Sequence, residues 1–296
     1  MKMASLHVNS CGTDSITTGV GLCRYVAEHY DIPFIHNKDT AIVYNDTYDV
    51  LFVKYGILLF CNYREELFEI YRKAKRIISL EEDYTMDADY RFLKLNPKYE
   101  IISNMPFRAE ETGGEYLNWN RLTWENDIPM HDPIVRGLGY YGSYRPDRSV
   151  YFEKYFKDAP YQVSISTFGR NSLKFRDLDR NIRMFDPFKN RNKIQAFESV
   201  LIVEDVFTHT HYNSPPNRFY ECLSRGVPML FDASTKNTYK EAGYDIDPYI
   251  VTSQSDVEYK LKSIEEIRQE QRLVWFRDYR AEFDKDFIDV MANLKL

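Results

Sequence analysis

The sequence predicts an α/β protein built from two doubly wound domains. Short apolar runs rich in β-branched residues alternate with helix-like stretches along almost the whole chain of 296 residues. Such alternation is typical of parallel sheets that are covered on both faces by helices. An irregular stretch rich in Gly, Asn, Asp, Pro and Trp, from about Met105 to Leu138, separates two sets of strands. We therefore expect an N-terminal domain over 1–135 and a second domain over 136–280.

Each set contains four expected strands. They are Ser5–Asn9, Tyr48–Val53, Arg76–Leu80 and Tyr99–Ser103 in the first set, and Tyr161–Thr167, Glu198–Glu204, Val227–Asp232 and Pro248–Ser253 in the second. Helices are expected over 18–30, 63–76 and 255–271, the last with Ser255 as its N-cap. The segment 281–296 reads as a further helix, with Phe283, Phe287 and Val290 on its apolar face.

Composition restricts the class of protein. The formal net charge of −6 argues against a protein that coats nucleic acid indiscriminately. The four cysteines are scattered without C-x-x-C pairs, which indicates free thiols in a reducing compartment. The N-terminus lacks the apolar region of a secretion signal, and the longest apolar run, Val50–Cys61, is too short to span a bilayer. We therefore expect a cytoplasmic protein.

One local segment is basic. Between Phe168 and Lys193 there are eight Lys and Arg residues against three Asp residues, a local charge of +5. This segment is either a solvated loop or a contact surface for phosphates, with Arg170, Lys174 and Arg176 as the candidate contacts.

A first candidate site follows a short apolar segment that ends at Gly142 and Ser143. A helix is expected to start near Pro146, with Arg145 and Arg148 flanking its N-terminus. Helix N-termini attract anions, and guanidinium groups bind phosphate oxygens bidentately. The pattern fits a phosphate or diphosphate site, although a surface turn with two solvated arginines would have the same sequence.

A second candidate site lies in the stretch from Ser214 to Asp232. Pro216 suits the first helical position and Gly226 suits the C-cap, which places Arg218 and Glu221 one turn apart on one helix face. Such a pair is often a surface ion pair. At the start of a helix in a nucleotide-binding domain, Arg218 could instead bind phosphate while Glu221 binds ribose hydroxyls.

The third candidate is a group of carboxylates after the strand at 76–80, namely Glu81, Glu82, Asp83, Asp87 and Asp89. Carboxylates at the C-terminal end of a strand are placed to act as a general base. They could equally coordinate a cation or form a solvated loop.

Two weaker patterns complete the set. Gly19 lies where the first strand turns into the first helix and would let a ligand approach the backbone. His209 and His211 have no third ligand in the sequence pattern, so we predict no metal site there.

Together these segments resemble the DNA β-glucosyltransferases of T-even bacteriophages, which have the GT-B fold. The resemblance runs through Gly142–Arg145, the quartet Arg218–Glu221, the strand Val227–Asp232 with Lys236, and the strand that leads to Asp83. It implies two Rossmann-like domains facing a cleft, with 281–296 as a helix that packs back on the N-terminal domain.

The resemblance also implies the roles of individual residues. Asp83 would be the catalytic base, Glu221 would bind the ribose, and the diphosphate would be bound by Ser143, Arg145, Arg148 and Arg218. Arg145 and Arg148 are three positions apart where the family has four. Gly19, Gly142, Tyr212 and Asn213 would be further donor contacts.

The implied activity is transfer of a sugar from a UDP-sugar to 5-hydroxymethylcytosine or 5-hydroxymethyluracil in double-stranded DNA. The base would flip out of the duplex, and the reaction would invert the anomeric centre. A divalent cation, Mg²⁺ or Mn²⁺, could assist diphosphate release, although no ligand set is evident. We expect a monomer in the cytoplasm of an infected bacterium. The alternatives are a GT-B enzyme acting on a glycan or small molecule, and a non-catalytic nucleotide- or DNA-binding module.

Overall fold

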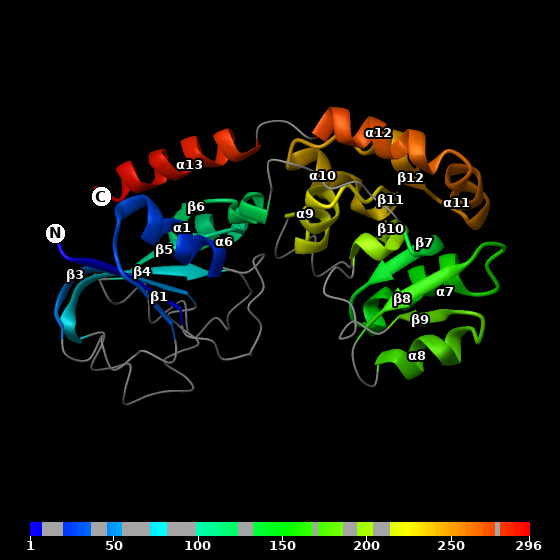
Figure 1. The fold of residues 1–296 in the computed structure, drawn as a ribbon, viewed down its shortest axis with the longest axis horizontal. Helices are drawn as coiled ribbons and strands as arrows, with labels where there is room; N and C mark the ends of the chain where they lie inside the picture. The colour runs from blue at the N-terminus through cyan, green and yellow to red at the C-terminus, as the bar shows by residue number, and fades with distance from the viewer. Residues whose placement is uncertain are drawn as a thin grey trace. The chain divides into compact units, whose positions relative to one another are not determined.

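In the computed structural model, the described residues are 1–7, 20–36, 46–54, 72–81, 99–123, 133–167, 171–185, 194–203, 214–275 and 279–296. The chain divides into two compact units. Met1–Thr123 and Arg280–Leu296 form the first, and Trp124–Tyr279 forms the second. Each unit has its own parallel sheet (Figure 1). Each also has its own hydrophobic core.

The first unit is built on a parallel sheet with the strand order β2-β1-β3-β4-β5-β6. Its strands are β1 (Met3–His7), β2 (Phe34–His36), β3 (Tyr48–Lys54), β4 (Ala74–Glu81), β5 (Tyr99–Ser103) and β6 (Glu115–Tyr116). The order 2-1-3-4-5 is that of flavodoxin-like sheets, here extended by β6. Val50, Leu51, Phe52 and Val53 are successive in β3 and all buried. Because successive side chains point to opposite faces, both faces of this sheet are covered.

Helices α1 (Val20–Tyr30), α6 (Pro106–Thr112) and α13 (Tyr279–Asn293) and the 3₁₀ turn η2 (Trp119–Thr123) complete the first unit. The last helix is held by both apolar and polar contacts.

The rings of Phe283 and Phe287 are buried edge-on against Tyr25 of α1, with centroids 5.1 and 4.8 Å away. The Tyr25 hydroxyl donates to Asp284 at 2.7 Å. The apolar face predicted for this segment, which includes Val290, is therefore the face that the first unit buries.

The second unit is built on a parallel sheet with the strand order β12-β11-β10-β7-β8-β9. Its strands are β7 (Val135–Tyr141), β8 (Val163–Ser166), β9 (Arg183–Phe185), β10 (Phe197–Ile202), β11 (Met229–Asp232) and β12 (Ile250–Val251). Counted from β9, this is the 3-2-1-4-5-6 order of dinucleotide-binding domains. The order reverses between β7 and β10.

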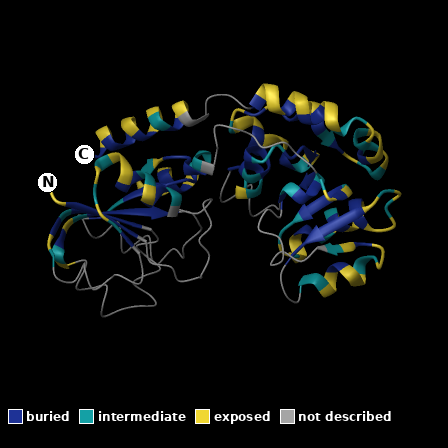
Figure 2. Ribbon diagram, in the orientation of Figure 1, coloured by how far each residue is buried: buried dark blue, intermediate teal, exposed yellow. Residues whose placement is uncertain are grey.

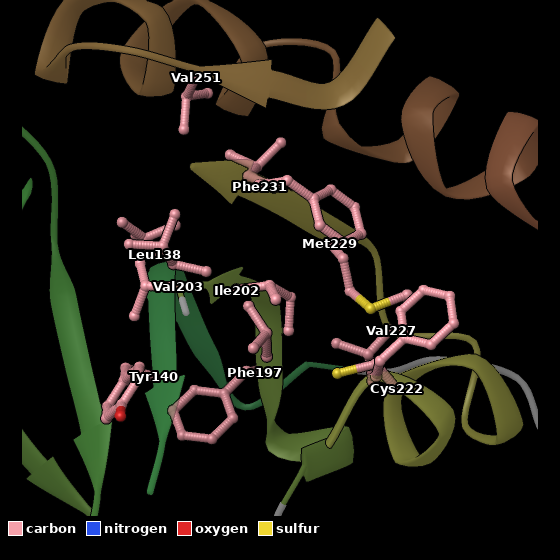
Figure 3. Packing of buried hydrophobic residues seen from close by; sticks show 14 of the residues in the cluster. Leu138, Tyr140, Phe197, Ile202, Val203, Cys222, Val227, Met229, Phe231 and Val251 are labelled. Carbon is pink, nitrogen blue, oxygen red and sulfur yellow. The ribbon is translucent and has the colours of Figure 1, made fainter. Parts of the chain in front are cut away.

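The described residues of this unit also form six helices and four 3₁₀ turns. The helices are α7 (Ser149–Phe156), α8 (Asn171–Leu178), α9 (Asn217–Ser224), α10 (Lys236–Glu241), α11 (Gln254–Leu261) and α12 (Ile264–Trp275), and the turns are η3 (Pro146–Arg148), η4 (Ile194–Ala196), η6 (Ala233–Thr235) and η7 (Asp247–Tyr249). Most described strand residues of this unit are buried, and exposed residues are concentrated on the outer faces of the helices and in the turns (Figure 2). Aliphatic side chains of β10 and β11 pack with Cys222 and Val227 in the core of this unit (Figure 3).

All eight expected strands are confirmed, with ends that shift by a few residues. The expected helix at 63–76 is wrong at its end, because residues 74–76 begin β4 and Ala74 pairs with Tyr48 of β3. Residues 63–71 lie outside the described part of the chain.

The expected helix at 255–271 is two helices, α11 and α12. The N-cap of α11 is Ser253 and not Ser255. Ser253 has an extended backbone (φ −151°, ψ 168°), and its hydroxyl accepts a hydrogen bond from the Asp256 N–H at 3.1 Å.

Within the described ranges, we find no helix that combines the length and apolar character needed to span a membrane.

Candidate functional site

The candidate site lies at the carboxyl end of the second sheet. Strands β8 and β9 extend to one side of β7, whereas β10, β11 and β12 extend to the other. Ligands of doubly wound sheets bind beyond the strand ends at such a reversal of order. Gly142 and Ser143 follow β7 directly, and α9, which carries Arg218 and Glu221, is the first helix after β10. We call this region the donor edge, defined by Tyr140–Arg148, Arg218 and Glu221.

Gly142 turns the chain at the end of β7. Its φ of +148° lies in a region that residues with side chains rarely adopt. Its N–H donates to the Ser166 carbonyl at 3.0 Å. A Cβ at this position would lie 2.8 Å from Nη2 of Arg218 and 3.2 Å from the Tyr140 hydroxyl. Only glycine therefore fits here with the guanidinium of Arg218 in place.

Tyr140 connects several of the predicted site residues. Its side chain is fully buried, and its hydroxyl accepts a hydrogen bond from Nη1 of Arg148 at 3.3 Å. The same hydroxyl donates to the carbonyl of Ser143 at 3.3 Å. Arg148 is itself only 7% exposed. The turn after β7 and the buried arginine are thus joined through one phenol.

Arg218 lies against the face of the same ring. The carbon at the centre of its guanidinium is 4.9 Å from the Tyr140 ring centroid, a cation–π contact. Its Nη1 is buried and has no hydrogen-bond partner among the described residues. Buried guanidinium N–H groups are costly to leave unpaired and bind carboxylate or phosphate oxygens strongly. The arrangement therefore suits an anion at this position.

Helix α9 presents its polar residues on one side. Phe219, Tyr220, Cys222 and Leu223 are buried, whereas Arg218 and Glu221 are partly exposed.

The ends of α9 correct two predictions by one residue each. Pro216 is the N-cap (φ −69°, ψ 157°) rather than the first helical residue, and Arg225 is the C-cap. Gly226 follows with φ +64°, and the N–H groups of Gly226 and Val227 bond to the carbonyls of Leu223 and Cys222 at 3.1 and 2.9 Å. This is the Schellman ending, which needs a residue without a side chain after the cap.

Tyr141 adds a second phenol at this edge. Burial raises the pKa of Tyr141 above its usual value of 10.0, the carboxylate of Glu221 raises it further, and Arg218 lowers it. Tyr141 therefore lies within electrostatic range of both Arg218 and Glu221. Neither Tyr140 nor Tyr141 was predicted from the sequence as a site residue, although both precede Gly142-Ser143 at the end of an apolar run.

The start of the following helix also corrects a prediction. Pro146 begins the 3₁₀ turn η3, and the α-helix α7 begins only at Ser149. Arg145 is the exposed N-cap residue of that turn, whereas Arg148 is buried at its end. The structure thus brings Gly142, Ser143, Arg148 and Arg218 together around Tyr140, with Arg145 at the exposed side of the same turn.

Helix α8 carries two basic residues of the basic segment, Lys174 and Arg176. Lys174 and Arg176 are exposed on either side of the buried Phe175. The Lys174 ammonium lies 5.3 Å from the ring centroid of Tyr144, which follows Ser143. This places one lysine of the basic segment next to the donor edge.

Several predicted residues lie outside the described part of the chain, namely Gly19, Asp83, Arg170, Tyr212 and Asn213. The described strand that leads toward Asp83 is β4, which ends in the fully buried Glu81. The Ser79 hydroxyl donates to the carboxylate of Glu81. On the neighbouring β5, the Ser103 hydroxyl accepts from the Met105 N–H at 3.1 Å.

A protein-bound metal does not fit the described residues. Mg²⁺ and Mn²⁺ prefer oxygen ligands, whereas the donor edge offers mostly guanidinium groups and phenols. No group of three or more His, Cys, Asp and Glu side chains among the described residues could hold a metal ion.

Comparisons with known proteins rest on structure. No family model matches the chain, and no curated protein matches it by sequence. T4 phage β-glucosyltransferase in complex with UDP and Mn²⁺ matches with a TM-score of 0.65 and 15% identity, covering 100% of this chain and 99% of that one. An α-glucosyltransferase in complex with UDP and a 13-mer DNA matches with a TM-score of 0.58 and 12% identity, covering 97% and 96%. AviGT4, a glycosyltransferase involved in avilamycin A biosynthesis, matches with a TM-score of 0.53 and 10% identity, covering 99% and 98%.

Each of these matches covers nearly all of this chain and nearly all of the matched protein. The sequence identities are so low that the matches are evidence for the fold alone. Two six-stranded parallel sheets flanked by helices are the architecture that this chain shares with these enzymes. The predicted GT-B fold class is confirmed.

Proposed function

We propose that this chain is a glycosyltransferase that moves a sugar from a UDP-sugar to the hydroxymethyl group of a modified pyrimidine in DNA. The observation that carries the proposal is the donor edge, where Arg218 lies beside Gly142 and its buried Nη1 has no hydrogen-bond partner among the described residues. The structural likeness to glucosyltransferases that were solved with UDP, one of them together with DNA, supports the same assignment.

In this proposal the donor edge binds the nucleotide. Arg218, Arg148 and Arg145 bind the diphosphate together with Ser143, and Glu221 accepts hydrogen bonds from the ribose hydroxyls. Gly142 allows the close approach that the turn requires. Gly19, Tyr212 and Asn213 are proposed as further donor contacts.

The proposed reaction is a direct displacement. Asp83 takes the proton of the acceptor hydroxyl while the oxygen of that hydroxyl attacks the anomeric carbon of the sugar. The bond between the anomeric carbon and the diphosphate breaks, with inversion at that carbon. Negative charge then develops on the departing diphosphate, where the guanidinium groups are already in place. Preorganised donors of this kind contribute about 2.7–4 kcal/mol each to lowering the barrier.

The proposed acceptor is 5-hydroxymethylcytosine or 5-hydroxymethyluracil in double-stranded DNA. A base inside a duplex must flip out to reach an enclosed site, which costs a few kcal/mol of unstacking. The DNA phosphates would be contacted by Arg170, Lys174 and Arg176. Of these, Lys174 and Arg176 belong to the described residues and are exposed on α8. We place the enzyme, as a monomer, in the cytoplasm of an infected bacterium.

A second candidate function is transfer to a glycan or small molecule. The likeness to AviGT4 favours it, because that enzyme shares the fold and belongs to an antibiotic pathway. It would use the same donor edge and differ in the acceptor.

The experiment that tests the proposal is mass spectrometry of nucleosides. DNA containing either hydroxymethylated pyrimidine is incubated with the protein and a panel of UDP-sugars, then digested and analysed. The expected result is a hexose or pentose mass shift that Asp83→Ala abolishes. The matched control is Asp289→Ala, which removes an exposed carboxylate from α13 and should leave the mass shift unchanged.

The outcomes separate the candidates. If the protein hydrolyses the UDP-sugar but no modified nucleoside is detected, the result would favour transfer to a glycan or small molecule instead of DNA. UDP binding without turnover would favour a non-catalytic module. If transfer occurs but does not weaken as salt rises, or is unaffected when Arg170, Lys174 and Arg176 are neutralised, the basic segment does not contact DNA.

A further inference from the structure

We propose that Tyr140 is the positioning residue of the donor edge. Its ring supports the Arg218 guanidinium, and its hydroxyl joins Arg148 to the backbone of Ser143. This inference rests on the proposed function, because it concerns the same diphosphate site. It assigns to a core residue the arrangement of three groups that would contact the ligand.

The ring of Tyr140 is itself held rigidly. It is fully buried, and it packs edge-on against Phe152 of α7 with centroids 5.0 Å apart and an interplanar angle of 69°. Phe156 and Phe175 lie 5.9 Å away at tilted angles. Surrounded in this way, the ring offers a fixed surface to whatever lies on its remaining face.

Arg218 lies on that remaining face. Its guanidinium is held by the ring at 4.9 Å and by the space that the missing Cβ of Gly142 leaves. A carboxylate partner would neutralise the guanidinium, whereas an aromatic face orients it and leaves its N–H groups for a ligand. The buried Nη1, which has no hydrogen-bond partner in the described part of the chain, agrees with this arrangement.

The hydroxyl of Tyr140 completes the arrangement. A phenol has one proton to donate and lone pairs to accept, and here both capacities are used within the donor edge. Arg148 donates to the hydroxyl and the hydroxyl donates to the Ser143 carbonyl, each at 3.3 Å. Because the peptide group is planar, fixing the Ser143 carbonyl fixes the orientation of the whole peptide between Ser143 and Tyr144.

The competing explanation is that Tyr140 is a core tyrosine whose hydroxyl is merely satisfied by its neighbours. Tyr155 provides the matched control, because it is equally buried in the same unit. Its hydroxyl bonds to Asp232 and, at 2.9 Å, to the Val251 carbonyl, which are not part of the donor edge. Removing either hydroxyl should lower stability, but only the loss at Tyr140 should alter anion binding.

The experiment measures binding by isothermal titration calorimetry for wild type, Tyr140→Phe and Tyr155→Phe, with UDP, uridine and inorganic pyrophosphate as ligands. For Tyr140→Phe we expect UDP and pyrophosphate to bind about fivefold to tenfold more weakly, a tenfold loss being about 1.4 kcal/mol. Uridine, which has no phosphate, should bind as it does to wild type. The hydrogen bonds are long, so a larger loss is not expected. Tyr155→Phe should bind all three ligands as wild type does, despite a lower Tm.

A second variant tests the ring. Tyr140→Leu removes the aromatic face together with the hydroxyl and should weaken UDP binding beyond Tyr140→Phe. Circular dichroism establishes whether this variant is folded, and if it is not, the comparison of the two Phe variants decides alone.

The outcomes distinguish this inference from the proposed function. If wild type binds UDP and Tyr140→Phe binds it equally well, or loses uridine binding to the same degree, the positioning role is overturned and the donor site stands. If wild type binds pyrophosphate but not UDP, and Tyr140→Phe weakens pyrophosphate, the positioning role stands and the UDP-sugar assignment falls. Wild type that binds neither ligand overturns both.

Discussion

Two arginines of the first unit are used differently from Arg218 of the second unit. Those two pair with carboxylates. Arg76 forms a two-pronged bond to Glu100 at 2.8 and 2.9 Å, and Arg121 donates to Asp286 at 3.1 Å. At the donor edge of the second unit, Arg218 lies on an aromatic ring instead. In an ion pair, the carboxylate neutralises the guanidinium and occupies its N–H groups. An aromatic ring orients the guanidinium but leaves its charge and N–H groups available for a ligand.

The polar groups at the two sheet ends show the same contrast. Where β4 and β5 end in the first unit, Glu81 and Ser103 are fully buried and bonded to neighbouring side chains or backbone. Where β7 ends in the second unit, Ser143 and Arg145 are exposed and Glu221 is partly exposed. The first arrangement is that of a scaffold, and the second is that of a binding surface.

The largest effect is expected from removing the arginine on the ring. Arg218→Met keeps the length of the side chain and removes its charge, so charge that develops on the diphosphate loses one preorganised donor. We expect kcat for transfer from a UDP-sugar to fall by a factor of 10² to 10³, or about 2.7–4 kcal/mol. Steady-state kinetics at saturating donor measures this.

The control for this prediction is Arg225→Met, which makes the same change at the opposite end of α9. It should keep kcat close to the wild-type value. Equal losses in the two variants would mean that general charge, and not the position on Tyr140, is what matters.

The next effect concerns stability in the first unit. Ser79→Ala removes the hydroxyl that donates to the buried Glu81. Leaving a buried acceptor without its donor costs about 1–3 kcal/mol, so the free energy of unfolding should fall by that amount. Urea unfolding measures the loss, and the affinity for UDP should remain unchanged.

A buried serine of the second sheet serves as the matched control. Ser164 is also fully buried, but its hydroxyl has no hydrogen-bond partner among the described residues. Ser164→Ala should therefore be close to neutral or slightly stabilising. A loss as large as that of Ser79→Ala would show that burial of a serine, rather than its bond to Glu81, determines the cost.

A third effect separates close contact from backbone strain at glycine. Gly142→Ala places a Cβ 2.8 Å from Nη2 of Arg218, so the guanidinium must shift from its position on the ring. We expect UDP to bind about tenfold more weakly, or about 1.4 kcal/mol.

Gly243→Ala is the matched variant, since Gly243 also has a positive φ (+84°) but no atom within 4 Å of its added Cβ. This variant should lower stability without altering UDP affinity. If both variants lose affinity equally, backbone strain accounts for the effect and the contact with Arg218 does not.

Local and long-range contacts also differ in how well the sequence predicts them. The eight expected strands follow from apolar runs, which indicate burial, and both sheets bury most of their described strand residues. Strand β7 was not among them, because Gly137 and Gly139 interrupt its apolar pattern. Gly139 is required by a close neighbour, since its Cβ would lie 2.5 Å from the Phe197 ring. Contacts of that kind join residues far apart in the chain and leave no local signal.

Some residues of the donor edge can likewise be predicted from the sequence, and others cannot. Arg218 and Glu221 stand out in the sequence because a helix start with one-turn spacing is a local pattern. Tyr140 does not, because a tyrosine within an apolar run usually indicates a half-buried strand. Its contacts with Arg148 and Arg218 depend on how β7, η3 and α9 meet in space.

The smallest effect is a dependence of stability on pH that belongs to the scaffold of the second unit. Burial alone would raise the pKa of Asp232, but hydrogen bonds from Tyr155, Ser234 and Lys154 outweigh it and lower the pKa below the ordinary value of 3.8. A carboxyl group whose pKa is lowered by folding stabilises the protein above its unfolded pKa. That contribution is lost as the pH falls below about 3.8 through the folded pKa.

Asp232→Asn removes this titration. The free energy of unfolding of wild type should exceed that of the variant at pH 6, and the gap should close as the pH falls from 5 to 3. One proton can change the gap by at most about 1.4 kcal/mol per pH unit. Tyr155→Phe, which removes one donor to the carboxylate, should show an intermediate closing of the gap. A gap that stays constant from pH 6 to pH 3 in urea unfolding would show that Asp232 acts through packing alone. The acid sensitivity of this unit would then have to come from other carboxylates.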